Sequence, residues 1–212
     1  MSTIAVVDYS MGNLYSVAKA LEHVAPKWRI LVTGDPAQVA AADRVVFPGQ
    51  GAMPDCVRHL EESGLREEVL RAAREKPMFG VCIGAQMLFE RSAEGDTPGL
   101  GLLAGEVVRF DPRTTVAADG ARLKVPHMGW NRVRQLREHP VWAGIPDETY
   151  FYFVHSYHFA PGDPRDCVGD CEYGRRFTCA VARDNIFATQ FHPEKSSGHG
   201  LKLYENFIGW RP

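Results

Sequence analysis

A cysteine between two glycines is the first group in this sequence whose surroundings suggest chemistry. The segment Gly80-Val81-Cys82-Ile83-Gly84 has the spacing of a nucleophile elbow, a strained strand-to-helix turn that exposes one side chain. An apolar run precedes the segment and a helical pattern follows it, as such a turn requires. A helix N-terminus beneath Cys82 would favour the thiolate, and the backbone N–H of Ile83 could face an oxyanion. The pentapeptide alone fits a buried structural cysteine equally well.

A histidine and a glutamate two residues apart could supply the other groups that such a nucleophile needs. In Gln190-Phe191-His192-Pro193-Glu194, the proline is expected to keep the backbone extended, which places positions two apart on one face. Glu194 could then reach one imidazole nitrogen of His192 while the other nitrogen faces a thiol. An isolated histidine is more often an ordinary core or surface residue, but beside an elbow cysteine this pair predicts a general base and its orienting carboxylate.

The loop Pro48-Gly49-Gln50-Gly51-Ala52 is the third candidate. It follows an apolar run, and its two glycines would let backbone N–H groups approach a substrate carbonyl, which suits an oxyanion hole. A plain turn is the alternative. Neither this loop nor Gly99-Leu100-Gly101 completes a dinucleotide-binding G-x-G-x-x-G motif, and the phosphate-binding G-x-x-x-x-G-K-[ST] motif does not occur.

The elements that must position these residues alternate between strand and helix in the first half of the chain. The predicted strands are residues 3–8, 28–32, 44–47 and 78–81. The predicted helices are residues 14–24, capped by Asn13, residues 36–42, one or two around Ser63-Gly64, and residues 83–90. This alternation predicts an α/β fold with a doubly wound, flavodoxin-like parallel sheet, helices on both faces, and ligands at the carboxyl ends of the strands.

Between residues 100 and 189 the pattern changes to short β runs broken by proline and glycine. The expected strands are residues 106–110, 150–155, 177–183 and 186–189, and a closing helix covers residues 201–208. Antiparallel strands that extend the same sheet fit this pattern better than a second domain, because we find no linker, repeat or low-complexity segment. The sequence therefore predicts a single domain over residues 1–212 with one mixed sheet.

Length and composition restrict the possible functions. The chain has 212 residues, 45% of them hydrophobic and 24% charged, so it can bury a sizeable core, which excludes disorder and small disulfide scaffolds. Its formal net charge of −2 leaves no basic excess for nucleic acid or an anionic membrane surface. We expect no signal peptide or membrane span, because the N-terminus lacks a basic region followed by an apolar core and no apolar run approaches about 18 residues. We expect no cofactor and no metal, since Cys167, Cys171 and Cys179 lack a fourth metal ligand. The odd, scattered set of five cysteines predicts a reduced, cytoplasmic setting.

Together the three motifs resemble those of the class I (triad) glutamine amidotransferases over the whole chain, and they occur in the same order along the sequence: Pro-Gly-Gln-Gly at 48–51, Gly-Val-Cys-Ile-Gly-Ala-Gln at 80–86 and His-Pro-Glu at 192–194. The resemblance implies that Cys82 attacks the side-chain amide of glutamine, that His192 takes and returns the proton, and that Glu194 orients the imidazole. It further implies that Gly49, Gly51 and Ile83 surround the oxyanion. The amino-acid end of glutamine would be held by Gln86 and by the backbone of Ser156 and Tyr157.

Three further segments resemble the glutamine amidotransferase subunits of imidazole glycerol phosphate synthases. They are Asp8-Tyr9-Ser10-Met11-Gly12-Asn13-Leu14, Pro126-His127-Met128-Gly129-Trp130-Asn131 and His192-Pro193-Glu194-Lys195-Ser196. The resemblance implies a heterodimer with a (β/α)8 cyclase subunit, which would use the ammonia in histidine biosynthesis. The implied partner surface consists of His127, Met128, Gly129, Trp130, Asn131 and Lys195, with the lysine meeting an acidic residue of the cyclase.

One expectation does not depend on the resemblance. A triad and a glutamine pocket would occupy a single domain of 212 residues and leave no second domain to bind the ammonia acceptor. Another chain would therefore have to bind it. Three alternatives remain open: the amidotransferase component of another synthase, such as anthranilate or aminodeoxychorismate synthase; a free-standing cysteine hydrolase; and a non-catalytic binding protein in which Cys82 has no chemical role.

Overall fold

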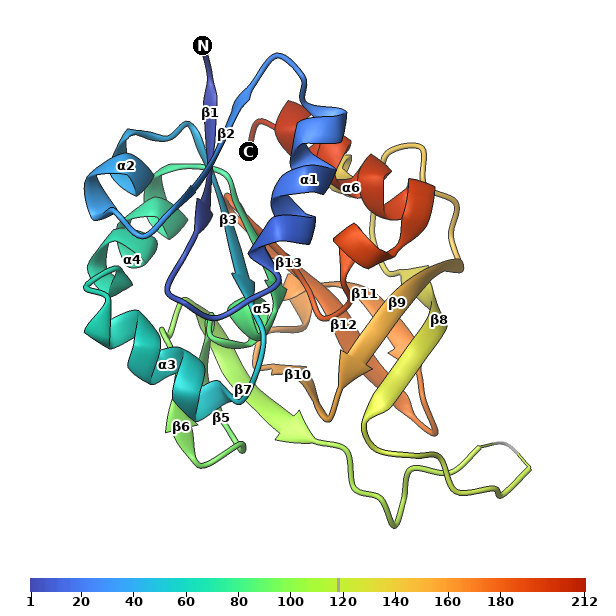
Figure 1. Ribbon diagram of the computed structural model, residues 1–212. Coiled ribbons are helices and arrows are strands. Elements are labelled where there is room, and N and C mark those ends of the chain that lie inside the picture. Colours follow the sequence, from blue (N-terminus) through green and yellow to red (C-terminus); the bar gives the residue numbers. More distant parts are fainter. Residues whose placement is uncertain (118) are drawn as a thin grey trace.

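Parallel strands form the centre of the fold in the computed structural model, which describes residues 1–117 and 119–212 (Figure 1). The elements of the first half are β1 (Thr3–Val7), α1 (Leu14–Val24), β2 (Arg29–Thr33), α2 (Pro36–Ala41), β3 (Arg44–Gly49), α3 (Met53–Glu62), α4 (Arg66–Glu75), β4 (Met78–Cys82) and α5 (Ile83–Gln86). The parallel strands run in the order β2-β1-β3-β4-β13, where β13 is Ile186–Thr189. This is the flavodoxin-like order that the sequence predicts.

Antiparallel strands extend this parallel sheet on the side of β13. The remaining elements are β5 (Phe89–Ser92), β6 (Thr97–Pro98), β7 (Leu103–Arg109), β8 (His127–Gln135), η1 (Pro140–Trp142), β9 (Thr149–His155), β10 (Tyr157–Pro161), η2 (Pro164–Asp166), β11 (Cys167–Glu172), β12 (Arg176–Arg183), η3 (Pro193–Lys195) and α6 (Ser197–Gly209). β12 pairs with β13, and both β10 and β11 pair with β12; β8 and β9 follow β11. The predicted mixed sheet is confirmed.

Helices cover both faces of the parallel strands. Figure 1 shows α1 and α6 packed together on one face and α2, α3 and α4 on the other. All residues of β3, β4 and β13 are buried as a consequence. A parallel strand covered on both faces carries a nearly continuous apolar run, which explains why these strands are easy to find in the sequence. No helix in the described residues is long and apolar enough to cross a membrane.

Two local predictions are wrong. The helix expected at residues 83–90 ends at Gln86, because Phe89 is buried and begins β5, which pairs with the distant β7. Asn13 stands at the N-cap of α1, but its side chain makes no capping hydrogen bond. Its backbone, at φ −85° and ψ 61°, lies outside the β region that a capping residue normally adopts.

Candidate active site

Cys82 occupies the turn between β4 and α5 in a strained backbone conformation. It is the last residue of the strand and the N-cap of the helix, with φ 54° and ψ −112°. A non-glycine residue at positive φ is uncommon, and with ψ at −112° Cys82 also lies outside the left-handed helical region, so the surrounding fold must maintain this strain. The side chain is 4% exposed and lines a pocket of about 250 Å³ at the carboxyl ends of β3 and β4.

The glycine after the elbow allows a close approach between β3 and α5. A Cβ atom on Gly84 would lie 2.0 Å from the carbonyl oxygen of Phe47, so no other residue fits without moving the strand. In the same way, a Cβ atom on Gly49 would lie 2.5 Å from the Tyr9 hydroxyl and 2.6 Å from the Gly84 nitrogen. Gly49 and Gly84 therefore allow the loop to pack directly against the elbow.

His192 and Glu194 make the contact that the sequence predicts, but through a different backbone. The Nδ1–H of His192 donates to Oε1 of Glu194 at 2.8 Å, with both side chains almost fully buried. His192 is extended, whereas Pro193 starts the 3-10 turn η3 instead of prolonging the extension. Proline suits the first position of such a turn because its φ is already fixed. The turn, and not a shared strand face, brings the carboxylate back to the ring.

The other ring nitrogen of His192, Nε2, has no hydrogen-bonding partner within the described residues, and the ring lines the same pocket as Cys82. Burial alone would lower the pKa of His192, but Cys82 and, next, Glu194 outweigh it and raise the pKa from 6.5 to about 10. The imidazole therefore carries a proton at neutral pH and can donate it to a leaving group.

We expect the substitution Cys82→Ala to lower the pKa of His192. Cys82 makes the largest upward contribution to this pKa, and in its absence only Glu194 opposes burial, which lowers the pKa. An NMR titration of the imidazole in both proteins measures the shift. An unchanged pKa would show that Cys82 does not interact with the ring.

The same raised pKa predicts how stability depends on pH. A group whose pKa is higher in the folded than in the unfolded protein stabilises the fold below its unfolded pKa, and the stabilisation disappears as pH rises through the folded value. The contribution of His192 should thus decline between pH 6.5 and about 10. Denaturant unfolding across this range should show a steeper loss of stability for the wild type than for Cys82→Ala.

Most of the predicted substrate contacts meet in the pocket. Its walls are formed by Gln50, Gly51, Cys82, Ile83, Gln86, Glu94, Pro126, Val154, His155, Ser156, Tyr157 and His192. Gly49 is the one predicted oxyanion residue that does not line it, because it is packed behind the loop against Tyr9 and Gly84. Glu194 lies behind His192, as an orienting residue should.

Two polar residues of the site were missed by the sequence analysis. Gln190 donates to the Cys82 sulfur at 3.7 Å and accepts a hydrogen bond from Gln86 at 3.0 Å. The sequence could have identified Gln190, because it lies only two residues before His192. Glu94 lies in the turn between β5 and β6, accepts the Met53 N–H at 2.8 Å and adds a carboxylate to the pocket wall. No local sequence pattern identifies Glu94, because the pairing of strand β5 brings this residue to the pocket.

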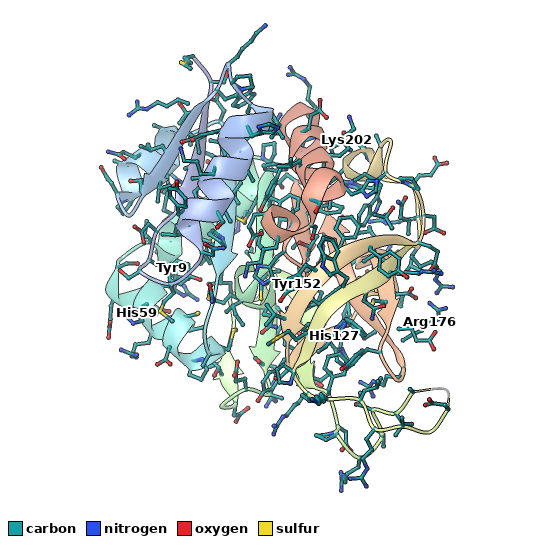
Figure 2. All side chains as sticks on the ribbon, turned by 45° about the vertical axis from the view of Figure 1, so that its right-hand side comes forward. Tyr9, His59, His127, Tyr152, Arg176 and Lys202 are labelled. Atoms are coloured by element: carbon teal, nitrogen blue, oxygen red, sulfur yellow. The ribbon has the colours of Figure 1, made fainter. Side chains whose placement is uncertain are left out.

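The residues expected at a partner surface are divided between two sides of β8. Met128 and Trp130 are 62% and 50% exposed, whereas His127 is only 3% exposed and does not belong to a surface. The physical reason is the alternation of side chains along a strand. Trp130 lies opposite Tyr152 of β9, and the Lys195 ammonium lies 6.0 Å from the Tyr152 ring centre. Figure 2 labels Tyr152 and His127 on these neighbouring strands.

The outward side of these two strands, together with Lys195, forms a continuous apolar and cationic surface that we call the β8–β9 face. It comprises Met128, Trp130, Arg132, Tyr150, Tyr152 and Lys195. It adjoins the active-site pocket, because Val154 of the same strand β9 lines the pocket and Lys195 follows Glu194 directly. Among the described residues, no cluster of three or more His, Cys, Asp or Glu side chains could hold a metal ion.

The fold and the site define the class of protein, and comparison with known families agrees. The family model described as glutamine amidotransferase class-I matches residues 5–209. The chain therefore belongs to the class I glutamine amidotransferases.

Comparison with individual proteins indicates which members of this family the chain is similar to. The chain is 65% identical to the imidazole glycerol phosphate synthase subunit HisH of Aromatoleum aromaticum over 212 residues, which cover all of both chains. It is 61% identical to the subunit of the same name from Dechloromonas aromatica over 210 residues, 99% of this chain and 97% of the relative. Among solved structures, PurLQS from Thermotoga maritima matches with a TM-score of 0.73 at 17% identity, covering 98% of each chain, and shows the same fold.

Proposed function

We propose that this chain is the glutaminase subunit of an imidazole glycerol phosphate synthase. It hydrolyses glutamine to glutamate and ammonia and delivers the ammonia to a (β/α)8 cyclase subunit. The observation that carries the proposal is the strained elbow at Cys82, which lies in one pocket with His192 while Glu194 holds the far side of the ring. Full-length relatives named as this subunit supply the particular reaction. We place the protein in the cytoplasm, in keeping with its five free cysteines.

In this mechanism the Cys82 thiolate attacks the side-chain carbonyl carbon of glutamine. The backbone N–H groups of Gly51 and Ile83 stabilise the resulting oxyanion. The His192 imidazolium protonates the amide nitrogen, the C–N bond breaks, and ammonia leaves a thioester on Cys82; the neutral imidazole then takes a proton from the water that cleaves the thioester to glutamate. Glu194 keeps the ring in the productive orientation throughout.

Polar groups in the pocket wall suit the amino-acid end of glutamine. Glu94 provides a carboxylate for the α-ammonium group. Gln86 is 1% exposed and its Oε1 atom has no hydrogen-bonding partner within the described residues, so a ligand N–H would satisfy it. Backbone groups of Ser156 and Tyr157 complete this wall. The cyclase would then use the ammonia on a phosphoribulosyl formimino aminoimidazole carboxamide ribonucleotide, giving imidazole glycerol phosphate and aminoimidazole carboxamide ribonucleotide.

Glutaminase activity should depend on the partner, because ammonia released without an acceptor is lost to solvent. The isolated chain is expected to be a poor glutaminase, stimulated roughly 5- to 150-fold when the cyclase and its nucleotide ligand bind. Glutamate formation is measured for the chain alone, with the cyclase, and with the liganded cyclase. Equal turnover in all three mixtures would contradict coupling, and no glutamate in any of them would contradict the proposed function.

Lys195 is expected to contribute to docking on the β8–β9 face. Lys195→Ala should weaken cyclase binding or uncouple glutamine hydrolysis from synthesis, because breaking a desolvated charge pair from one side costs several kcal/mol whereas a rim charge contributes less than about 1 kcal/mol. Lys202→Ala is the control, since Lys202 pairs with Glu205 on α6 and lies away from Tyr152 in Figure 2. If affinity, coupling and stimulation stay at wild-type levels in both variants, Lys195 has no role in the interface.

A further inference from the structure

A chain of hydrogen bonds connects β8 to the wall of the active-site pocket. His127 of β8 lies opposite His155 of β9, and their Nδ1 and Nε2 atoms are 2.9 Å apart. The remaining Nδ1 atom of His155 lies 2.7 Å from the carbonyl oxygen of Tyr157, and the Nε2 atom of His127 lies 3.3 Å from the Asn131 amide nitrogen. Both imidazoles are at most 5% exposed.

The partners at the two ends determine the direction of every bond in this chain. A carbonyl oxygen can only accept, so His155 donates from Nδ1 to Tyr157 and, if neutral, must accept at Nε2 from the Nδ1–H of His127. His127 then accepts at Nε2 from Asn131. The amide of Asn131 is oriented for this independently, because its oxygen accepts the N–H of Arg132 and its nitrogen donates to the carbonyl of Glu172. Both ends thus require the same pair of neutral tautomers.

The surroundings keep the two rings neutral. Burial lowers the pKa of His127 to about 4, and burial followed by the neighbouring His127 holds the pKa of His155 well below its ordinary value. Aromatic rings enclose His127: Phe153 stacks at a centroid distance of 4.8 Å and Tyr173 at 4.0 Å. An imidazole buried in this way needs its partners, since a buried polar atom without one is costly.

This chain of hydrogen bonds ends at the carbonyl group of Tyr157, which also accepts a hydrogen bond from a residue of the proposed active site. Tyr157 O accepts a second, longer hydrogen bond from Gln86 at 3.4 Å. The same Gln86 amide nitrogen donates to Gln190, which donates to the Cys82 sulfur. The placement of this one peptide group therefore affects both the wall that faces the substrate and the amide pair beside the nucleophile.

We propose that His127 and His155 are positioning residues that hold the Ser156–Tyr157 backbone in the conformation that binds the amino-acid end of glutamine. This inference rests on the proposed function of the pocket. His127 touches neither the pocket nor the expected position of the reacting atoms, so it acts through His155. Its effect should consequently appear in the affinity for glutamine more than in the rate of the chemical steps.

Two substitutions of His127 separate hydrogen bonding from ring packing. His127→Phe keeps an aromatic ring between Phe153 and Tyr173 but removes the donor to His155. His127→Asn loses the ring but keeps an N–H donor at the position of Nδ1, because both atoms are bonded to Cγ. In complex with the cyclase, we expect His127→Phe to raise the KM for glutamine about tenfold with kcat within about twofold of wild type, and His127→Asn to remain within about threefold in both parameters.

The opposite ranking, with His127→Phe near wild type and His127→Asn impaired, would show that ring packing matters and would overturn the proposal, as would wild-type KM values in both. Ammonium-dependent synthesis by the same complexes checks that the cyclase is active and assembled. A wild-type complex without glutaminase activity would refute the proposed function and not this inference.

Nitrogen NMR of the wild-type imidazoles is an independent test that needs no variant: both rings should carry the proton on Nδ1, and a proton on Nε2 of His155 would overturn the proposal.

Discussion

Cys82→Ala is expected to abolish glutamine hydrolysis while the complex with the cyclase still makes product from added ammonium salt. The substitution removes the only atom proposed to bond to the substrate, so glutaminase turnover should fall by at least about 1,000-fold. The acceptor chemistry belongs to the other chain and needs only ammonia. Glutamate formation and product formation are measured separately, with glutamine and with ammonium chloride as nitrogen sources.

Cys167→Ala is the matched control for this variant. Cys167 is a half-buried, free cysteine on β11 and does not line the pocket. It should retain both activities. Retained glutaminase activity in Cys82→Ala would remove the nucleophile from the mechanism, and a loss of the ammonium-dependent reaction would show that the substitution disturbs assembly instead of chemistry.

His192→Ala and Glu194→Gln should differ in severity, because the two residues have different tasks. Without the imidazole there is no group to protonate ammonia or to activate water, so His192→Ala should approach the defect of Cys82→Ala, a loss of roughly 100- to 10,000-fold. Glu194→Gln keeps an oxygen that can accept the Nδ1–H but loses the charge, so turnover should fall by a smaller factor and stay measurable. Steady-state glutaminase kinetics in the cyclase complex rank the three variants.

An unaffected Glu194→Gln variant would contradict the orienting role. Asp184 cannot take over this role, because it precedes β13 and lies at the end of this strand opposite to His192. Glu205→Gln, which alters an exposed carboxylate paired with Lys202 on α6, should leave glutaminase kinetics unchanged and serves as the control.

Features encoded within a few neighbouring residues were predictable from the sequence. The elbow is visible because the glycines that permit the close packing of Cys82 must stand beside it, and the contact of His192 with Glu194 is visible because only Pro193 separates them. The parallel strands were predictable because burial on both faces requires continuous apolar runs.

Features that depend on strand pairing were not predictable. The helix expected at residues 83–90 fails because Phe89 pairs with Leu103, and the same pairing brings Glu94 to the pocket. His127 looks like part of a surface motif, but the side of β8 on which it lies is decided by its pairing with His155. A shift of one residue in register would exchange the two sides of the strand. Sequence patterns of one chain do not encode such long-range registers.

Transfer of nitrogen from glutamine to the cyclase product tests the central claim most directly. The chain and the cyclase subunit are supplied with glutamine labelled with 15N in its side-chain amide, in the presence of unlabelled ammonium ions at a concentration too low to support synthesis. The account predicts glutamate and imidazole glycerol phosphate in equal amounts, with the label in the imidazole ring. Unlabelled product, or glutamate formed without labelled product, would contradict it.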